Sequence, residues 1–199
     1  MSHAEEDGAS EGADITALIL DDHDTFRRGF AALDEAQSPD TDPATAAQRL
    51  AEIWSPLADL LDVHAVAEEQ IFYPALLRKG DKGDAVDETV DAVGDHNEIR
   101  DAVHAAARHR PGSTAWWEQV NAARAANTEH MAEEEDEALA DFRRNTTREQ
   151  RAALGKQFAE FKATHTVRDI DTSDQDPKRY VAEHLPGPAD VSLGIGSLR

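Results

Sequence analysis

Six residues whose types suit metal binding recur at helical spacing along the chain. Two histidines are each followed four residues later by a glutamate, and two further histidines stand alone. The pairs are His64 with Glu68 and His130 with Glu134, and the single histidines are His23 and His96. Residues four apart on a helix lie one turn apart on the same face, with Cβ atoms roughly 5–6 Å apart. Each pair would therefore direct an imidazole and a carboxylate into the same volume.

Such a set of side chains could hold two metal ions. Imidazoles can bind the metals separately while two carboxylates bridge between them, which neutralises the metal charge inside a core. The chain has no cysteine, so thiolate sites and disulfides are excluded, and a set of imidazoles and carboxylates suits iron, manganese or zinc. The alternative is a structural network in which the histidines only hydrogen-bond one another.

Two other classes of metalloprotein fit the spacing poorly. Ferritin-like bundles use a glutamate three residues before a histidine on two helices. An acid stands three residues before a histidine only at Asp101 and His104. Zinc proteases need an H-E-x-x-H motif, which is absent from the chain.

The elements that must position these residues are amphipathic helices. Apolar residues recur in alternating steps of four and three, and each of the four histidines falls within the stripe of a different helix. Helices are expected from Asp14 or Thr16 to Leu33, Pro43 to Leu77, Asp84 to Arg108, Ser113 or Thr114 to Arg144, and, with a capping box of Thr147 and Gln150, Thr147 to Thr164. Pro56 is expected to kink or split the second of these helices, and Pro74 to bend its last turn.

The pattern predicts an all-α fold, an up-down four-helix bundle with a short fifth helix and an irregular C-terminal tail. Polar residues on core faces are costly unless they find partners, so the four histidines should converge at one level of the bundle. The predicted organisation is a disordered acidic leader (1–13), the bundle domain (14–165) and a tail (166–199), in which Leu193, Ile195 and Leu198 could pack on the bundle or on a second subunit.

The formal net charge of −21 argues against nucleic acid and against anionic membranes as partners, since both need a basic footprint. No apolar run approaches the roughly 18 residues that span a membrane. The first residues lack the basic and apolar regions of a secretory signal. These features predict a cytoplasmic protein. A monomer or a homodimer is expected, since the tail could pack on its own bundle or on a second subunit.

Together the motifs resemble those of the hemerythrin HHE cation-binding family. That family has a lone His, then H-x-x-x-E-E, another lone His, and a second H-x-x-x-E. The matching segments are Asp-Asp-His23-Asp, His64-Ala-Val-Ala-Glu68-Glu69 followed by Phe-Tyr73-Pro, Gly-Asp-His96-Asn-Glu, and His130-Met-Ala-Glu-Glu134-Glu135. The resemblance covers about residues 14–165. It implies a hemerythrin-like bundle with two non-haem iron ions, or manganese or zinc in their place, bound by His23, His64, Glu68, His96, His130 and Glu134.

Arg100 departs from the pattern of the oxygen-carrying members. Those proteins have a second histidine one turn after the third-helix ligand, where this chain has Arg100. The resemblance then implies a centre with fewer protein ligands. It favours a protein that senses or reacts with a small diatomic or peroxide ligand (O2, peroxide or NO). Catalase-like or oxidase activity, iron storage or stress-related iron handling, and a metal-free interaction bundle are the alternatives.

No catalytic residue is assigned from the sequence. Glu69 and Tyr73 are candidates for positions next to the ligands, although a surface position for Glu69 and Glu135, and simple core packing for Tyr73, would also explain them. His104 is out of phase with His96 by about 80°, so it should be peripheral. The three tryptophans, Trp54, Trp116 and Trp117, are expected to pack away from the metal level.

Overall fold

The computed structural model describes residues 13–37 and 42–187, which form helices joined by short connections and contain no strand. In chain order the elements are α1 (Ile15–Glu35), α2 (Pro43–Ala67), the π-helix η1 (Glu68–Phe72), α3 (Tyr73–Lys79), α4 (Asp84–Ala106), α5 (Thr114–Asp136), α6 (Ala138–Asn145), α7 (Arg148–Thr164) and α8 (Pro177–His184).

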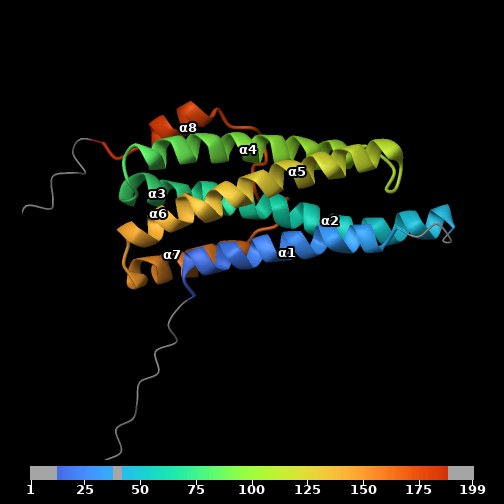
Figure 1. The fold of residues 1–199 in the computed structure, drawn as a ribbon, viewed down its shortest axis with the longest axis horizontal. Helices are drawn as coiled ribbons and strands as arrows, with labels where there is room; N and C mark the ends of the chain where they lie inside the picture. The colour runs from blue at the N-terminus through green and yellow to red at the C-terminus, as the bar shows by residue number, and fades with distance from the viewer. Residues whose placement is uncertain (1–12, 38–41, 188–199) are drawn as a thin grey trace, which may run out of the picture.

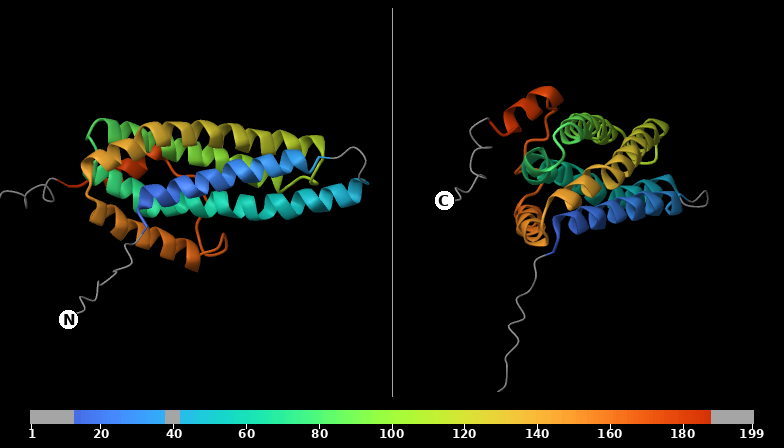
Figure 2. Two further views of the ribbon diagram at one scale, coloured as in Figure 1. Left: turned by 60° about the horizontal axis from the view of Figure 1, so that its bottom comes forward. Right: turned by 60° about the vertical axis from the view of Figure 1, so that its left-hand side comes forward.

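Four long helices form the bundle. Consecutive helices among α1, α2, α4 and α5 run in opposite directions along the long axis (Figure 1). The short helices α3 and α6 continue α2 and α5 at one end of the bundle. Figure 2 shows α7 beside α1 and α8 on the outside of α4. The predicted all-α bundle with a short fifth helix is confirmed.

Side-chain caps define several helix ends. The carboxylate of Asp14 accepts a hydrogen bond from the backbone N–H of Thr16 (3.0 Å), so α1 begins after Asp14. Ser113 caps α5 in the same way. Thr147 and Gln150 form the reciprocal bonds of the predicted capping box at the start of α7. These short side-chain acceptors satisfy backbone donors that have no partner within the helix.

Of the two predicted effects of Pro56, a kink or a split, the structure contradicts the split. Helix α2 passes through Pro56 without a break and ends only at Ala67. Pro56 lies on the exposed face, where water can satisfy the carbonyl that the missing N–H leaves free. The departure from α-helical geometry comes further along, in the π-helix η1, just before Pro74.

Two other expectations about the helices were wrong. The fourth helix is interrupted at Glu137, which separates α5 from α6. Glu133 and Glu137 are one turn apart within an acidic run, and like charges at this spacing destabilise a helix. The expected irregular tail contains α8, which packs against α4. The predicted leader (apart from Ala13) and Leu193, Ile195 and Leu198 lie outside the described residues.

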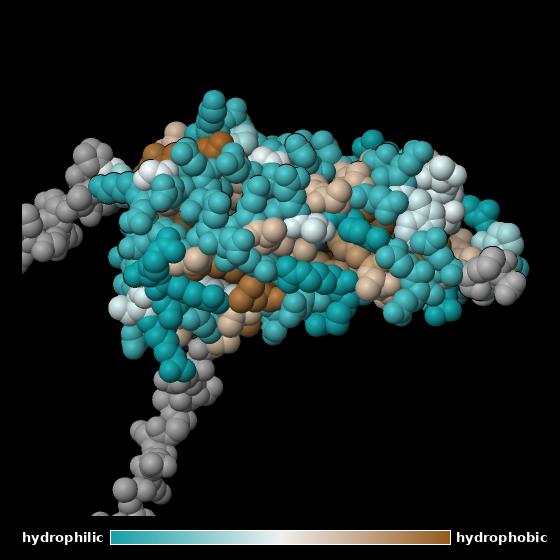
Figure 3. All heavy atoms as spheres, viewed as in Figure 1, coloured by the Kyte–Doolittle hydropathy of each residue, from teal (hydrophilic) through white to brown (hydrophobic). Residues whose placement is uncertain are grey.

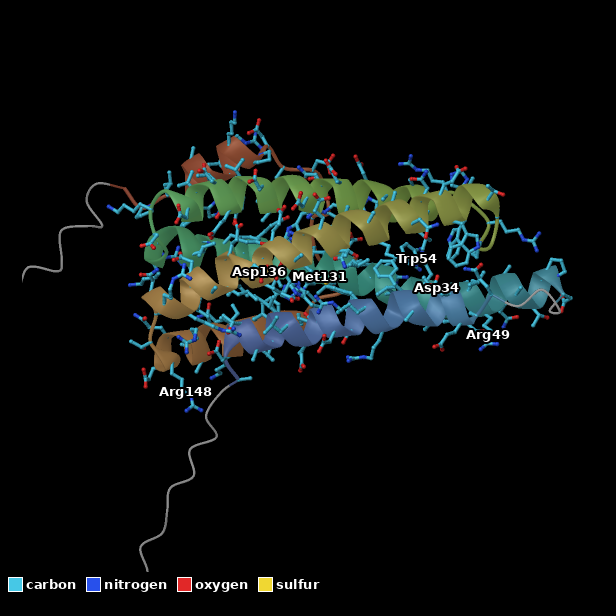
Figure 4. The ribbon with its side chains drawn as sticks, in the orientation of Figure 1. Asp34, Arg49, Trp54, Met131, Asp136 and Arg148 are labelled. Atoms are coloured by element: carbon cyan, nitrogen blue, oxygen red, sulfur yellow. The ribbon has the colours of Figure 1, made fainter. Side chains whose placement is uncertain are left out.

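The core is divided into two apolar clusters. The first gathers around Ile19, Phe72 and Phe142, and the second around Phe26, Trp54 and Trp116. On α1, α2 and α4 the histidine lies between the two clusters in sequence, whereas on α5 Met131 of the second cluster directly follows His130. Figure 4 shows Met131 of α5 near the middle of the bundle and Trp54 nearer the end where α1 leads to α2. Trp54 and Trp116 belong to the second cluster and Trp117 packs against it, so all three tryptophans pack among apolar residues, as predicted.

The face shown in Figure 3 is mostly hydrophilic, with smaller apolar areas among the polar side chains. No helix among the described residues is both long and apolar enough to cross a membrane.

Gly155 allows α7 to approach the start of α1. A Cβ atom at this position would lie 1.8 Å from the carbonyl oxygen of Ala13, which is backbone and cannot rotate away. We expect Gly155→Ala to lower the free energy of unfolding by about 1–3 kcal/mol, measured by urea unfolding. Gly94→Ala is the matched control, because a Cβ there meets no atom within 4 Å. Equal stability of the two variants would contradict this packing.

Candidate metal centre

The six residues predicted as ligands converge at one level of the bundle. Each of the four long helices supplies one histidine, and the two glutamates come from η1 and α5. None of the six is more than 3% exposed: His23, His64, Glu68, His96, His130 and Glu134. Their placement follows from the stripe pattern, because each occupies a core-facing position between apolar neighbours of its own helix.

Glu68 lies at the centre of the cluster. One carboxylate oxygen is 3.0 Å from His64 Nε2, and the other is 3.3 Å from His96 Nε2. Ligand atoms of His23, His64 and Glu68 all lie within 4.8 Å of one another, as do those of Glu68, His96 and His130. Glu68 therefore belongs to two possible metal-binding triads, as a bridging carboxylate would.

Glu134 belongs to neither triad, but it contacts their edge. Its Oε2 lies 3.3 Å from His23 Nε2, and its Oε1 accepts a hydrogen bond of 2.8 Å from the hydroxyl of Tyr73. Burial and the nearby carboxylates of Glu134 and Glu68 raise the pKa of Tyr73 well above its usual value. The tyrosine therefore keeps its proton and acts as a donor to Glu134.

The π-helix explains how both Glu68 and Tyr73 reach the centre. Residues five apart on an α-helix diverge by about 140°, but the wider turn here closes with a bond from the N–H of Tyr73 to the carbonyl of Glu68. Pro74 has no N–H, so in the same register it leaves the carbonyl of Glu69 without a helical donor. The hydroxyl of Tyr180, from α8, donates to that carbonyl. Single π-turns of this kind are frequent at functional sites.

Each histidine has a carboxylate against its outer ring nitrogen, Nδ1. The carboxylate always comes from the preceding helix of the bundle, and it is the immediate sequence neighbour of a residue in the cluster. The Nδ1 distances are Asp22 to His64, 3.0 Å; Glu69 to His96, 3.0 Å; Asp95 to His130, 3.5 Å; and Glu135 to His23, 2.8 Å. We name these four acids the outer carboxylates.

The outer carboxylates form a closed ring because neighbouring helices are antiparallel. A step of one residue rotates a side chain by about 100°, and reversing the helix direction reverses the sense of that rotation. On α1 and α4 the acid precedes the histidine, whereas in η1 and α5 it follows the glutamate. All four acid side chains are therefore displaced from the centre in the same rotational sense around the bundle axis. A carboxylate on Nδ1 favours a proton there and orients Nε2 toward the centre.

Sequence reasoning missed Asp22 and Asp95, and it left Glu69 and Glu135 between surface and interior positions. Each of these four acids is the immediate sequence neighbour of a predicted ligand, and this adjacency is the feature of the sequence that could have identified them. Glu69 is 2% exposed and contacts His96 and Arg100, so the surface interpretation of Glu69 was wrong. His104 is peripheral and contacts Asp62 at 3.2 Å.

Arg100 is buried and turned toward Glu69. Its guanidinium donates to Glu69 Oε1 at 2.9 Å and to the Asn97 side chain at 3.2 Å. It therefore neutralises an outer carboxylate. Gln175, in the segment before α8, donates to the other oxygen of Glu69 at 2.6 Å. The tail thus completes the surroundings of His96.

Basic side chains cover two further outer carboxylates. Lys162 of α7 contacts Asp22, and Arg27 lies 2.7 Å from Glu135. Phe158 of α7 adds an edge-on ring against His64. Three sides of the cluster are therefore closed by a basic residue on an outer carboxylate.

The carboxylates strongly affect the protonation of two histidines. Burial disfavours the imidazolium of His64, but Glu68 and Asp22 outweigh it and raise the pKa to about 10. For His96, burial is again outweighed, here by Glu68 and Glu69, and the pKa rises to about 9. In turn His64 and His96 hold the pKa of Glu68 well below its usual value despite burial. Without metal, protons neutralise the cluster.

The donor set fits a metal cation. Within the described part of the chain, several buried atoms facing the centre lie 3.0–3.3 Å from one another but make no well-aligned hydrogen bond: Nε2 of His23 and His64, both oxygens of Glu68, and Oε2 of Glu134. The Nε2 atoms of His96 and His130 face each other at 3.2 Å. Buried polar atoms without partners are costly, and a cation between them would satisfy nitrogen and oxygen lone pairs together.

Metal binding should release protons. At pH 7 His64 and His96 each hold an extra proton, and a metal binds only the neutral imidazole. We expect about two protons per chain to be released at pH 7, and the apparent affinity to rise with pH until those groups lose their protons near pH 9–10. Calorimetry of Co2+ binding in buffers of different ionisation enthalpy measures the count. No net release would mean that the histidines are already neutral.

The comparison with protein families agrees with this arrangement. The model of the hemerythrin HHE cation-binding domain matches residues 14–142. This range runs from the start of α1 into α6 and includes all six predicted ligands. No curated protein and no solved structure gives a significant match. The match spans more than half of the chain and includes both histidine–glutamate pairs. The chain therefore belongs to the hemerythrin HHE cation-binding domain family.

Proposed function

We propose that this protein binds two non-haem iron ions, one in each triad around Glu68, and that the centre reacts with or senses O2, peroxide or NO. The observation that carries the proposal is the convergence of orphaned buried donor atoms from four imidazoles and two carboxylates. A set of nitrogen and oxygen donors without thiolates suits iron, with manganese and zinc as competitors.

The residues divide into holding and orienting groups. His23, His64, His96 and His130 would bind through Nε2, Glu68 would bridge, and Glu134 would bind at the side of His23. Bound iron would supply a redox-active ion able to take a diatomic or peroxide ligand. The outer carboxylates at 2.8–3.0 Å from Nδ1 of His23, His64 and His96 favour a proton there, and Tyr73 holds a proton next to Glu134 Oε1. The apolar clusters on either side exclude bulk water from the centre.

Metal analysis and an optical spectrum test this proposal. Protein purified without chelator and reconstituted anaerobically with Fe2+ should hold about two iron ions per chain. Its spectrum should change on addition of air, peroxide or NO. Less than about one metal per two chains would instead favour a metal-free bundle. Zinc or manganese bound in preference to iron would also overturn the proposal.

A catalase-like enzyme is the second candidate, and the protonated Tyr73 beside Glu134 favours it, because peroxide decomposition requires proton transfer. Steady-state oxygen release from peroxide separates the two functions. Turnover well above that of free Fe2+ would indicate the enzyme. Turnover equal to that of free Fe2+, together with a spectrum that changes with added ligand, would indicate that the protein binds or senses the ligand without decomposing peroxide.

A further inference from the structure

A small cleft between α4, α5 and α6 leads to the fourth side of the centre. Its lining is acidic apart from one histidine and two alanines: Glu88, Asp91, Ala92, Asp95, His130, Glu133, Glu134, Glu137 and Ala138. We name it the acidic cleft. Its volume is about 30 Å³, which is enough for a cation with one or two water molecules.

The acidic cleft differs from the other three sides of the centre. Lys162, Arg27 and Arg100 neutralise the outer carboxylates Asp22, Glu135 and Glu69. The fourth outer carboxylate, Asp95, opens onto the cleft instead, and the described residues that line the cleft include no lysine or arginine. Among the described residues, Asp95 is thus the one outer carboxylate that no lysine or arginine contacts.

Two carboxylates that line the cleft have an oxygen without a hydrogen-bond partner. Oε2 of Glu88, a half-buried residue, is a buried atom with no partner. Glu134, which is 3% exposed, lies where the cleft meets the centre, and its Oε2 makes no hydrogen bond and is 3.3 Å from His23 Nε2. Burial and the nearby charges of Asp141, Glu137 and Asp84 outweigh that of Arg144 and raise the pKa of Glu88 to about 7. Grouping these acids costs stability, and a divalent cation would relieve their mutual repulsion.

We propose that the acidic cleft is the cation entrance of this domain: Glu88, Asp91, Asp95 and Glu137 hold a hydrated divalent cation, which then passes to His130 and Glu134. This proposal rests on the proposed metal centre. Oxygen ligands suit a cation that retains part of its water, and imidazole binds it after dehydration. The negative charge of the acidic cleft also raises the local concentration of cations and the rate at which they bind.

Loading kinetics with Co2+, whose absorption reports its coordination, test the entrance. The variant is Glu88→Gln/Asp91→Asn/Glu137→Gln, which spares the six core residues. We expect loading to slow about tenfold or more at low ionic strength, with less difference in high salt, while the final stoichiometry stays that of the wild type. The matched control, Asp59→Asn/Asp101→Asn/Glu118→Gln, removes the same number of carboxylates from exposed positions outside the cleft and should load at nearly the wild-type rate.

The outcomes separate this proposal from the one on which it rests. If the wild type binds no Co2+, the proposed centre fails and the entrance fails with it. If the wild type binds Co2+ and the cleft variant loads equally fast, only the entrance is overturned. Equal slowing of the control would show a general effect of net charge and would also overturn it. Thermal unfolding of the metal-free variants confirms that each is folded.

Discussion

Glu68→Ala is expected to abolish metal binding, lowering the affinity of both sites by at least about 100-fold. Residues that only orient ligands already cost 10–100-fold when replaced, and Glu68 belongs to both triads. Glu134→Ala should cost less, because Glu134 contacts only the His23 side and Tyr73. The measurement is metal content after anaerobic reconstitution with Fe2+, followed by removal of free metal.

Glu129→Ala is the matched control for these variants. Glu129 lies on α5, one residue from His130, but its side chain is exposed, so its removal should leave the metal content unchanged. Circular dichroism of each metal-free variant establishes that the helices are intact. If Glu68→Ala retained as much iron as Glu129→Ala, Glu68 could not bridge the two sites.

Glu69→Ala is expected to lower the free energy of unfolding of the metal-free protein by about 3–5 kcal/mol. The reason is that Arg100, which is 2% exposed, would keep its charge in the core without its carboxylate partner, and an unpaired buried charge costs that much. His96 and Gln175 would lose the same partner. Urea unfolding in the presence of a chelator measures the loss.

A double-mutant cycle identifies the source of this loss. Glu69→Ala/Arg100→Leu removes both charges, so it should be less destabilised than the sum of Glu69→Ala and Arg100→Leu, with a coupling on the order of 1–3 kcal/mol. The exposed Glu98→Ala on α4 should stay within about 0.5 kcal/mol of the wild type. If Glu69→Ala were equally mild, the buried ion pair would not stabilise this fold.

The bundle and its histidine level could be predicted because they depend on periodicity along single helices. The steps of four and three that place Ile19, His23 and Phe26 on one face also place each core histidine of the other helices. The caps at Asp14, Ser113 and Thr147 were predictable for the same local reason. What periodicity could not show is where a helix departs from ideal geometry, as at η1 and Glu137.

The composition of the cluster thus follows from residue type and spacing within each helix, and the family match agrees with it. Its surroundings depend on contacts between helices. Asp22, Asp95 and Lys162 join the site only because antiparallel packing turns the outer carboxylates in one sense and brings α7 against His64. Arg100 shows the difference most clearly. In the sequence, Arg100 only marked the place where the oxygen-carrying members have a histidine ligand. In the folded protein it is the buried partner of Glu69, because the direction of a long side chain depends on the charge it meets across the bundle.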